Sequence, residues 1–140
     1  MYRILIIYFC FIGADAMIKL HELFNTNAMR VGPQCLEEIG ATEDTLKKIA
    51  NREIPTSREG MCLITCIHEK FGMQNSDGKT NRAGTLIFLE PLKEDLAYYS
   101  RTKDHFMECL DTVSNEDEKC VIGTKLMECL SIGGMKKGII

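Results

Sequence analysis

Cysteines are the residues of this sequence whose type and spacing most plainly suggest a chemistry. The chain holds seven, and six of them are separated by 26, 3, 42, 10 and 8 residues, at Cys35, Cys62, Cys66, Cys109, Cys120 and Cys129. An even number of cysteines in a small extracellular domain is typical of a disulfide framework, whereas a structural zinc site favours several close cysteine pairs. Since only one close pair is present, we predict three disulfides, no metal site and no cofactor.

The seventh cysteine, Cys10, lies in an N-terminal segment that has the features of a signal peptide. A basic residue, a short apolar run and the sequence Ala14-Asp15-Ala16 follow one another in the order that signal peptidase requires. The alternative is a buried N-terminal helix. We predict that residues 1–16 are a signal peptide, which leaves a single secreted domain of residues 17–140 with six cysteines.

The overall composition argues against two classes of partner. The 140 residues include 17 Lys plus Arg and 20 Asp plus Glu, for a net charge of −3. Because phosphate binding needs basic residues clustered on one face, we expect no nucleic-acid partner. A spanning helix needs about 18 consecutive apolar residues, and no such run occurs, so we also expect no membrane insertion.

Residues that could perform catalysis do not gather in the sequence. His21, His68 and His105 stand alone on helical patterns, and none has a nucleophile or a paired carboxylate at a suitable spacing. We therefore predict that the protein is not an enzyme, and we expect ordinary surface histidines. A second hypothesis is that they sense pH, because the charge of histidine changes between about pH 5 and 8.

The elements that must position the cysteines are helices, because apolar residues recur every three or four positions along most of the chain. The expected helices lie at residues 17–40 with a kink or break at Gly32-Pro33, after Thr42, after Thr56, at 81–89, at 92–113, and from Ser114 to Gly133-Gly134. The sequences Thr56-x-x-Glu59 and Ser114-x-x-Asp117 match the capping box that opens many helices. Residues 81–89 also fit a strand, but their helical neighbours favour a helix and hence an all-α fold.

Helical geometry restricts how the cysteines can pair. Cys62 and Cys66 stand four residues apart on one helix, where Cβ atoms are about 5–6 Å apart, against roughly 3.8 Å in a disulfide. Cys120 and Cys129 point to opposite sides of one helix. A disulfide between Cys62 and Cys66 is therefore excluded, and so is one between Cys120 and Cys129. Most of the possible disulfide pairings of the six cysteines stay open.

The complete cysteine pattern, C-x26-C-x3-C-x42-C-x10-C-x8-C behind a predicted signal peptide, resembles that of the insect odorant-binding proteins of the pheromone and general odorant-binding superfamily. The resemblance covers nearly all of residues 17–140. It implies a compact bundle of about six helices around an apolar cavity, held by three interlocked disulfides. Carried over by position, the family's pairing is Cys35–Cys66, Cys62–Cys120 and Cys109–Cys129, which agrees with the two geometric exclusions.

The resemblance also implies a function. Such a protein is a secreted carrier that binds odorants, pheromones or related lipids in sensillum lymph or a similar fluid and delivers them to a membrane odorant receptor. It implies no cofactor and leaves a homodimer open. The expected cavity wall consists of Ile67, Phe71, Leu86, Phe88, Leu92, Tyr99, Phe106, Leu126, Ile139 and Ile140. The last two belong to a tail that is expected to fold over the cavity as a wall or lid.

A different function class stays open at this point. A secreted, disulfide-linked helical module with a filled core could act on a protein partner in venom, saliva or the reproductive tract, because a fold does not fix a function. The two hypotheses share the disulfides and differ in the core. Saturable binding of an apolar fluorescent probe distinguishes them.

Overall fold

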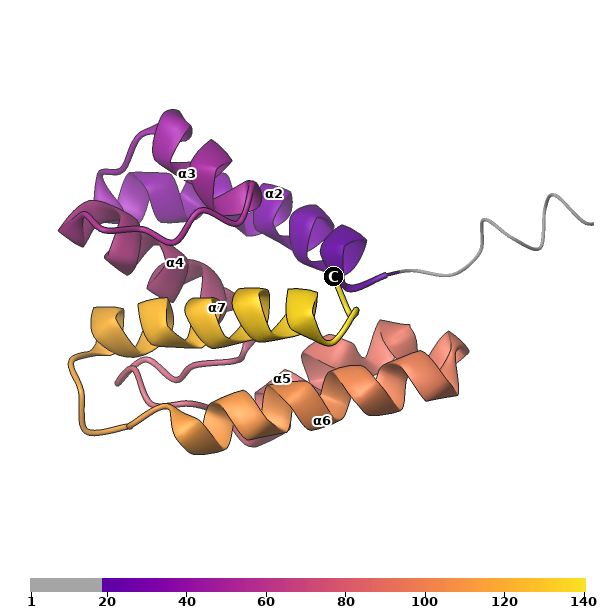
Figure 1. Ribbon diagram of the computed structural model, residues 1–140. Coiled ribbons are helices and arrows are strands. Elements are labelled where there is room, and N and C mark those ends of the chain that lie inside the picture. The colour runs from indigo at the N-terminus through magenta and orange to yellow at the C-terminus, as the bar shows by residue number, and fades with distance from the viewer. Residues whose placement is uncertain (1–18) are drawn as a thin grey trace, which may run out of the picture.

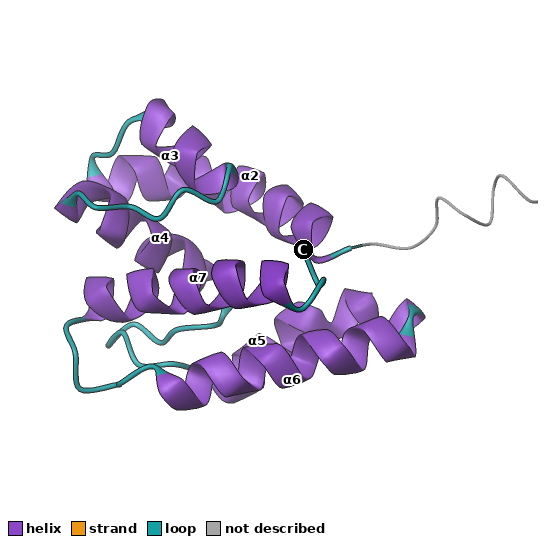
Figure 2. Ribbon diagram, in the orientation of Figure 1, coloured by secondary structure: helices purple, strands orange, loops and turns teal. Residues whose placement is uncertain are grey.

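The computed structural model describes residues 19–140, and the predicted signal peptide, residues 1–16, lies outside them. The described chain forms six α-helices and one short 3-10 helix, with no strand (Figures 1 and 2). The elements are α2 (Leu20–Ile39), α3 (Glu43–Ala50), α4 (Arg58–Phe71), α5 (Arg82–Leu89), η1 (Glu90–Glu94), α6 (Leu96–Thr112) and α7 (Lys119–Lys136). The predicted all-α fold is confirmed. Within residues 19–140, every helix is too short or too polar to span a lipid bilayer.

The first helix, α2, runs unbroken through Gly32 and Pro33, so the kink or break expected there is not needed to describe it. Gly32 is buried, and a Cβ atom built on it would lie 2.8 Å from Cδ2 of Leu46 in α3. The glycine therefore allows α3 to pack closely on α2 and does not end the helix. Thr42 caps α3 as predicted, because its side chain accepts a hydrogen bond from the amide of Thr45 at 3.3 Å.

Both predicted capping boxes are wrong in detail. The cap of α4 is Ser57, one residue after Thr56, and its side chain accepts from the amide of Gly60 at 3.1 Å. Glu59 accepts instead from the amide of Thr42 at 3.0 Å, which ties the start of α4 to the start of α3. Sequence alone could not separate Thr56 from Ser57, because both side chains can cap a helix.

The last helix begins at Lys119, because its cap lies four residues after the predicted cap at Ser114. Its N-cap is Glu118, whose carboxylate accepts from the amide of Cys120 at 3.1 Å. The helix also continues past Gly133-Gly134 to Lys136, and the chain reverses only at Gly138, which has a φ of 68°. Gly133 and Gly134 therefore do not terminate the helix, and their lack of a side chain lets other groups pack closely against it. A Cβ atom on Gly134 would lie 2.8 Å from Cδ1 of Ile140.

The middle of the chain contains the two elements that were hardest to assign. Residues 82–89 form a helix, α5, as the helical neighbours suggested. The helix expected over 92–113 begins only at Leu96, because Asp95 caps it by accepting from the amide of Tyr98 at 3.1 Å. The residues between α5 and Asp95 form η1, where Pro91 is compatible with the first turn of a helix.

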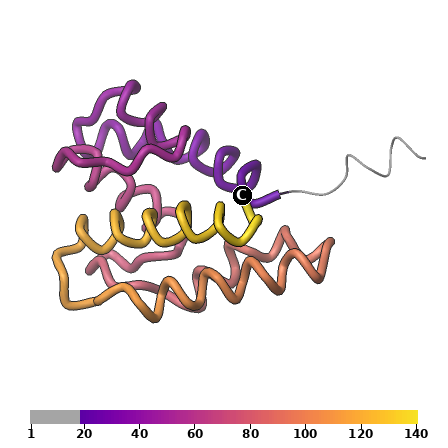
Figure 3. The backbone as a smooth tube through the Cα atoms, in the orientation of Figure 1, coloured from indigo at the N-terminus to yellow at the C-terminus, as the bar shows by residue number. Residues whose placement is uncertain are grey.

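The helices of the described chain form two groups, α2–α4 and α5–α6, and α7 packs between them. Figure 3 shows α7 lying between α2–α4 on one side and α5–α6 on the other, with the C-terminus at the same end of the molecule as the start of α2. Leu63, Ile64 and Ile67 on α4 are completely buried. This agrees with the prediction that α4, apolar on nearly all sides, lies at the centre of the fold.

Three disulfides connect these helices in series. Cys35–Cys66 joins α2 to α4, Cys62–Cys120 joins α4 to α7, and Cys109–Cys129 joins α6 to α7. This is the pairing that the resemblance implies. Since each bond joins a different pair of helices, the four longest elements of the described chain are cross-linked to one another.

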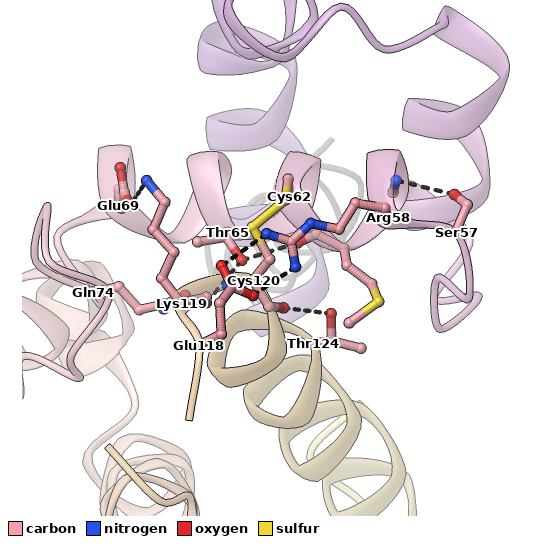
Figure 4. The surroundings of a disulfide bond; sticks show 12 residues. Ser57, Arg58, Cys62, Thr65, Glu69, Gln74, Glu118, Lys119, Cys120 and Thr124 are labelled. Atoms are coloured by element: carbon pink, nitrogen blue, oxygen red, sulfur yellow. Dashed lines mark hydrogen bonds and ion pairs between the residues drawn. A yellow bond between two sulfur atoms is a disulfide. The ribbon is translucent and has the colours of Figure 1, made fainter. Parts of the chain in front are cut away.

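The disulfide between α4 and α7 lies beside an exposed ion pair, as Figure 4 shows. Arg58 donates two hydrogen bonds to the carboxylate of Glu118, at 2.6 and 2.9 Å. The hydrogen bond from Arg58 is the main reason why the pKa of Glu118 falls to about 2. Glu118 therefore stays ionised while it caps α7, which favours the helix through its dipole.

Candidate functional site

A cavity of about 230 Å³ lies between the start of α2, the end of α3 and the other four α-helices. Its wall is mostly apolar, and the apolar residues that line it are Leu20, Phe24, Ile49, Ala50, Met73, Phe88, Phe106, Met127, Leu130 and Ile140. The polar residues that line it are His21, Asn25, Asn51, Arg52, His68 and Ser131. An apolar wall with a few polar groups is the usual composition of a small-molecule site.

Three of the ten residues predicted for the wall line this cavity, namely Phe88, Phe106 and Ile140. Ile67, Leu92 and Leu126 are completely or almost completely buried but do not line it, so the structure places them in the surrounding core. Leu86 and Tyr99 are partly exposed and lie outside the wall. A role for these residues in ligand binding stays a prediction.

Phe71 supports the wall from behind. Its ring stacks on Phe88 with centroids 4.7 Å apart and meets the edge of Phe24 with centroids 5.4 Å apart. Phe24 and Phe88 both line the cavity, so Phe71 fixes the position of two wall residues from different helices.

The wall residues that the sequence analysis did not predict belong mainly to the first two turns of α2, the end of α3 with the two residues after it, and α7, and one lies in the loop after α4. Leu20, Phe24 and Ile49 belong to amphipathic helix patterns in the sequence. That pattern indicates which helix face is buried, but it cannot indicate which part of the face meets the cavity. Met73 follows α4 in a loop and carries no periodic signal.

The C-terminal tail closes one side of the cavity. The Tyr98 hydroxyl accepts from the Leu20 amide at 2.9 Å and donates to the Ile139 carbonyl at 2.8 Å. The Ile139 amide donates to the Gly134 carbonyl at 2.9 Å, which holds the tail against α7. The side chain of Ile139 is buried and that of Ile140 lines the cavity. The tail therefore contributes to the wall, as expected from its apolar end.

A second hollow lies next to the cavity and is lined by basic side chains. Lys19, Arg52 and Arg101 line it together with Tyr98, and the Lys19 ammonium lies 4.4 Å from the centre of the Tyr98 ring. Arg52 lines both hollows and has a φ of 64°, a left-handed conformation that is rare outside glycine. Such backbone strain is often found at ligand sites.

Two of the three histidines are buried, so the expectation of surface histidines is correct only for His21. His68 is completely buried on α4 and lines the cavity, and its Nδ1 lies 3.2 Å from Oε1 of Gln74. His105 is buried on α6, and its Nε2 donates to the Leu130 carbonyl at 3.3 Å. A lone histidine on a helix looks the same in sequence whether its partner is water or another side chain.

Burial fixes the charge of His68. It lowers the pKa of this histidine to about 4, although the hydrogen bond with Gln74 acts in the opposite direction. The imidazole is therefore neutral between pH 5 and 8. His68 does not fulfil the pH-sensing hypothesis in that range.

Comparison with protein families gives a match over most of the described chain. The model of the PBP/GOBP family matches residues 19–131. General odorant-binding protein 19d of Drosophila melanogaster is 18% identical over 119 residues, which cover 85% of this chain and 79% of that protein. General odorant-binding protein 99b of the same species is 23% identical over 106 residues, which cover 76% of this chain and 68% of that protein.

Two solved structures share the fold. The odorant-binding protein dmelOBP28a from Drosophila melanogaster superposes with a TM-score of 0.69 at 19% identity, covering 82% of this chain and 95% of that one. A pheromone-binding protein from the cockroach Leucophaea maderae, in complex with the fluorescent reporter 1-anilinonaphthalene-8-sulfonic acid (ANS), gives a TM-score of 0.68 at 19% identity. That match covers 79% of this chain and 95% of the cockroach protein.

Proposed function

The chain belongs to the PBP/GOBP family, and from this premise we propose that it is a secreted carrier that delivers a small hydrophobic ligand to a chemosensory receptor. The family and the fold support binding of a small ligand. That the protein is secreted and that it delivers the ligand to a receptor are the two further parts of the proposal. Three disulfides support an extracellular site of action, because such bonds persist in oxidising compartments.

The observation that carries the proposal is the cavity itself. Apolar cavities of about 150 Å³ in protein cores bind molecules as small as benzene, and this cavity has about 230 Å³. Every α-helix of the described chain contributes to its wall, so a ligand would be surrounded by side chains from the whole bundle. Such a site suits transport, because it shields most of a hydrophobic molecule from water.

The polar groups of the cavity are not arranged for catalysis. His68, the one buried histidine in the wall, pairs with the neutral amide of Gln74 and has no nucleophile or carboxylate as a hydrogen-bonding partner among the described residues. A general base is normally oriented by such a group. This arrangement supports a carrier that releases its ligand unchanged.

Titration of the oxidised, signal-free protein with ANS tests the proposal. We expect saturable binding, because ANS fluoresces when it enters an apolar site, and displacement by small apolar compounds. The variant Ala50→Phe fills the cavity and is expected to weaken ANS binding at least about tenfold, since an inserted ring removes the space the probe needs. The matched control Ala97→Phe adds the same ring on an exposed position of α6 and is expected to bind as the unmodified protein does.

Two outcomes would contradict the carrier proposal. One is a correctly folded protein that shows no saturable ANS binding. The other is equal weakening by Ala50→Phe and Ala97→Phe, which would place the probe outside the cavity. Either would favour a module that acts on a protein partner.

A further inference from the structure

We propose that Nε2 of His68 accepts a hydrogen bond from a hydroxyl group of the ligand, so that the cavity selects apolar alcohols over ethers and aldehydes of equal size. The proposal rests on the proposed carrier function and names the class of ligand that this cavity takes. It follows from a buried polar atom of a wall residue, which lacks a hydrogen-bonding partner, and from the network that fixes the tautomer of its ring.

The unpartnered atom is Nε2 of His68. The side chain is completely buried and lines the cavity, and no group of residues 19–140 forms a hydrogen bond with Nε2. A buried polar atom without a partner is costly, and most such atoms in native proteins are paired with protein or water. A buried polar atom of this kind, on a residue of a mostly apolar wall, is a position where a ligand group can supply the missing bond.

The neighbouring amide determines what kind of group that must be. The Gln74 side-chain nitrogen donates to the Gly78 carbonyl at 2.8 Å and lies 3.4 Å from the Lys119 carbonyl, so its NH2 group faces two acceptors. Its Oε1 therefore faces His68 and can only accept. Nδ1 of His68 must carry the ring proton and donate to it at 3.2 Å.

The ring has a single proton as long as the imidazole is neutral. Since that proton is on Nδ1, Nε2 carries a lone pair and is an acceptor. Its low pKa, about 4, keeps this arrangement at neutral and mildly acidic pH. A ligand must then bring a donor.

A hydroxyl group is the donor that suits this wall. Aldehydes, ketones, esters and ethers offer only acceptors and would leave Nε2 unpaired, and an ammonium group would carry a charge into an apolar space at high cost. Nε2 has almost no surface of its own, so contact requires a small shift of the wall. Met73 and Met127 line the same cavity, and unbranched methionine side chains readjust easily.

Displacement of ANS by three compounds tests the selectivity. The compounds 1-octanol, octanal and 1-methoxyheptane have the same number of heavy atoms, and only 1-octanol has a donor. We expect 1-octanol to displace ANS at concentrations about 3- to 10-fold lower than the other two, which corresponds to one net hydrogen bond.

Two histidine variants identify the atom responsible. His68→Asn retains a donor at the position of Nδ1, for the bond to Gln74, but has no atom at the position of Nε2. His105→Gln is the matched control: it retains a donor at the position of Nε2, for the bond to Leu130, and removes an unpartnered Nδ1 outside the cavity. We expect His68→Asn to abolish the preference for 1-octanol and His105→Gln to keep it.

Nitrogen-15 NMR of the imidazole rings gives a readout that is independent of affinity. The expected spectrum shows His68 protonated at Nδ1, with a shift of the Nε2 resonance on addition of 1-octanol and none with 1-methoxyheptane. A proton on Nε2 in the free protein would overturn the proposal, and so would ANS displacement without preference. In the second case the carrier function stands, whereas a protein that does not bind ANS at all would refute the carrier function itself.

Discussion

Two regions of the molecule are stabilised by different kinds of bond. One is the central region between Cys35 and Cys129, and the other is the cavity end, which consists of the first turns of α2 and the residues after Cys129. Disulfides join α2, α4, α7 and α6 between Cys35 and Cys129. No disulfide of the described chain reaches the first turns of α2 or the residues after Cys129. There the Tyr98 hydroxyl connects Leu20 to Ile139 by two hydrogen bonds, and the other contacts are backbone hydrogen bonds, an exposed ion pair and apolar packing.

The difference indicates where the protein can open. A disulfide contributes about 3–4 kcal/mol in the chain-entropy account, whereas a hydrogen bond contributes about 0.5–1.5 kcal/mol. The disulfides of the central region can support a core that is not completely filled. The cavity end, by contrast, opens at a low cost in free energy. We therefore expect ligands to pass between the start of α2 and the C-terminal tail, and the following changes test this difference from the largest effect to the smallest.

Removal of a disulfide should have the largest effect on stability. Replacing both Cys62 and Cys120 by alanine opens a loop with a sequence separation of 58 residues, and we expect a loss of about 4 kcal/mol in the free energy of unfolding. The same change at Cys109 and Cys129, with a separation of 20, should cost about 3 kcal/mol. Urea unfolding of the two double variants measures both values. If neither variant loses stability, the cross-linked region does not owe its strength to these bonds.

The buried histidine of the cavity should make stability depend on pH. Unfolded His68 takes up a proton near its ordinary pKa of 6.5, whereas burial lowers the pKa in the folded protein to about 4. Because the unfolded chain binds this proton first, the free energy of unfolding should fall by about 3 kcal/mol as the pH is lowered from about 6.5 to about 4. The variant His68→Asn should lack this component. Parallel stability curves for the two proteins between these pH values would contradict the prediction.

The central region was also the easier one to predict from sequence. The apolar residues of α4 on nearly all sides indicated its central place, and its cysteines excluded the bond between Cys62 and Cys66. Spacing alone left the actual pairing undecided, and only the family resemblance selected one. Capping boxes failed because adjacent residues such as Thr56 and Ser57 can both cap a helix, and tertiary contacts decide between them.

The cavity end was harder to predict because its wall comes from the ends of several helices. Phe88 and Phe106 could be proposed as bulky apolar residues on helices expected near the centre. Leu20 and Ile49, by contrast, come to line the same cavity only through the packing of their helices, α2 and α3. The hydrogen-bonding partner of the buried His68 is Gln74, which lies in the loop after α4 and has no sequence signal. Pattern analysis identifies buried faces, but it does not show where two faces fail to fill the space between them.

Deletion of residues 138–140 should weaken both the fold and the cavity. Ile139 is buried and Ile140 lines the cavity, so we expect a loss of about 2–3 kcal/mol in the free energy of unfolding and about tenfold weaker ANS binding. Replacing both isoleucines by alanine keeps the backbone bond to Tyr98 and separates the contribution of the side chains. Unchanged ANS affinity after the deletion would show that the tail is not part of the wall.

Removal of the Tyr98 hydroxyl should have the smallest effect on stability and the most specific effect on ligand exchange. Tyr98→Phe loses the bonds to Leu20 and Ile139 but leaves the cavity wall unchanged, since Tyr98 does not line it. We expect a loss of about 1–2 kcal/mol in stability, because two buried hydrogen bonds of about 0.5–1.5 kcal/mol each are removed. Tyr99→Phe is the matched control, because the Tyr99 hydroxyl forms no hydrogen bond with the described residues and its side chain is half-exposed.

The rates of ANS exchange distinguish a gate from a simple brace. If ligands pass between α2 and the tail, Tyr98→Phe raises the association and dissociation rates together, by about fivefold for a loss of 1 kcal/mol, and leaves the equilibrium affinity nearly unchanged. Stopped-flow mixing with ANS measures both rates. Unchanged rates in Tyr98→Phe, with the expected loss of stability, would mean that ligands enter elsewhere. In that case the weaker bonding of the cavity end would reflect only the ends of the chain and not a route for the ligand.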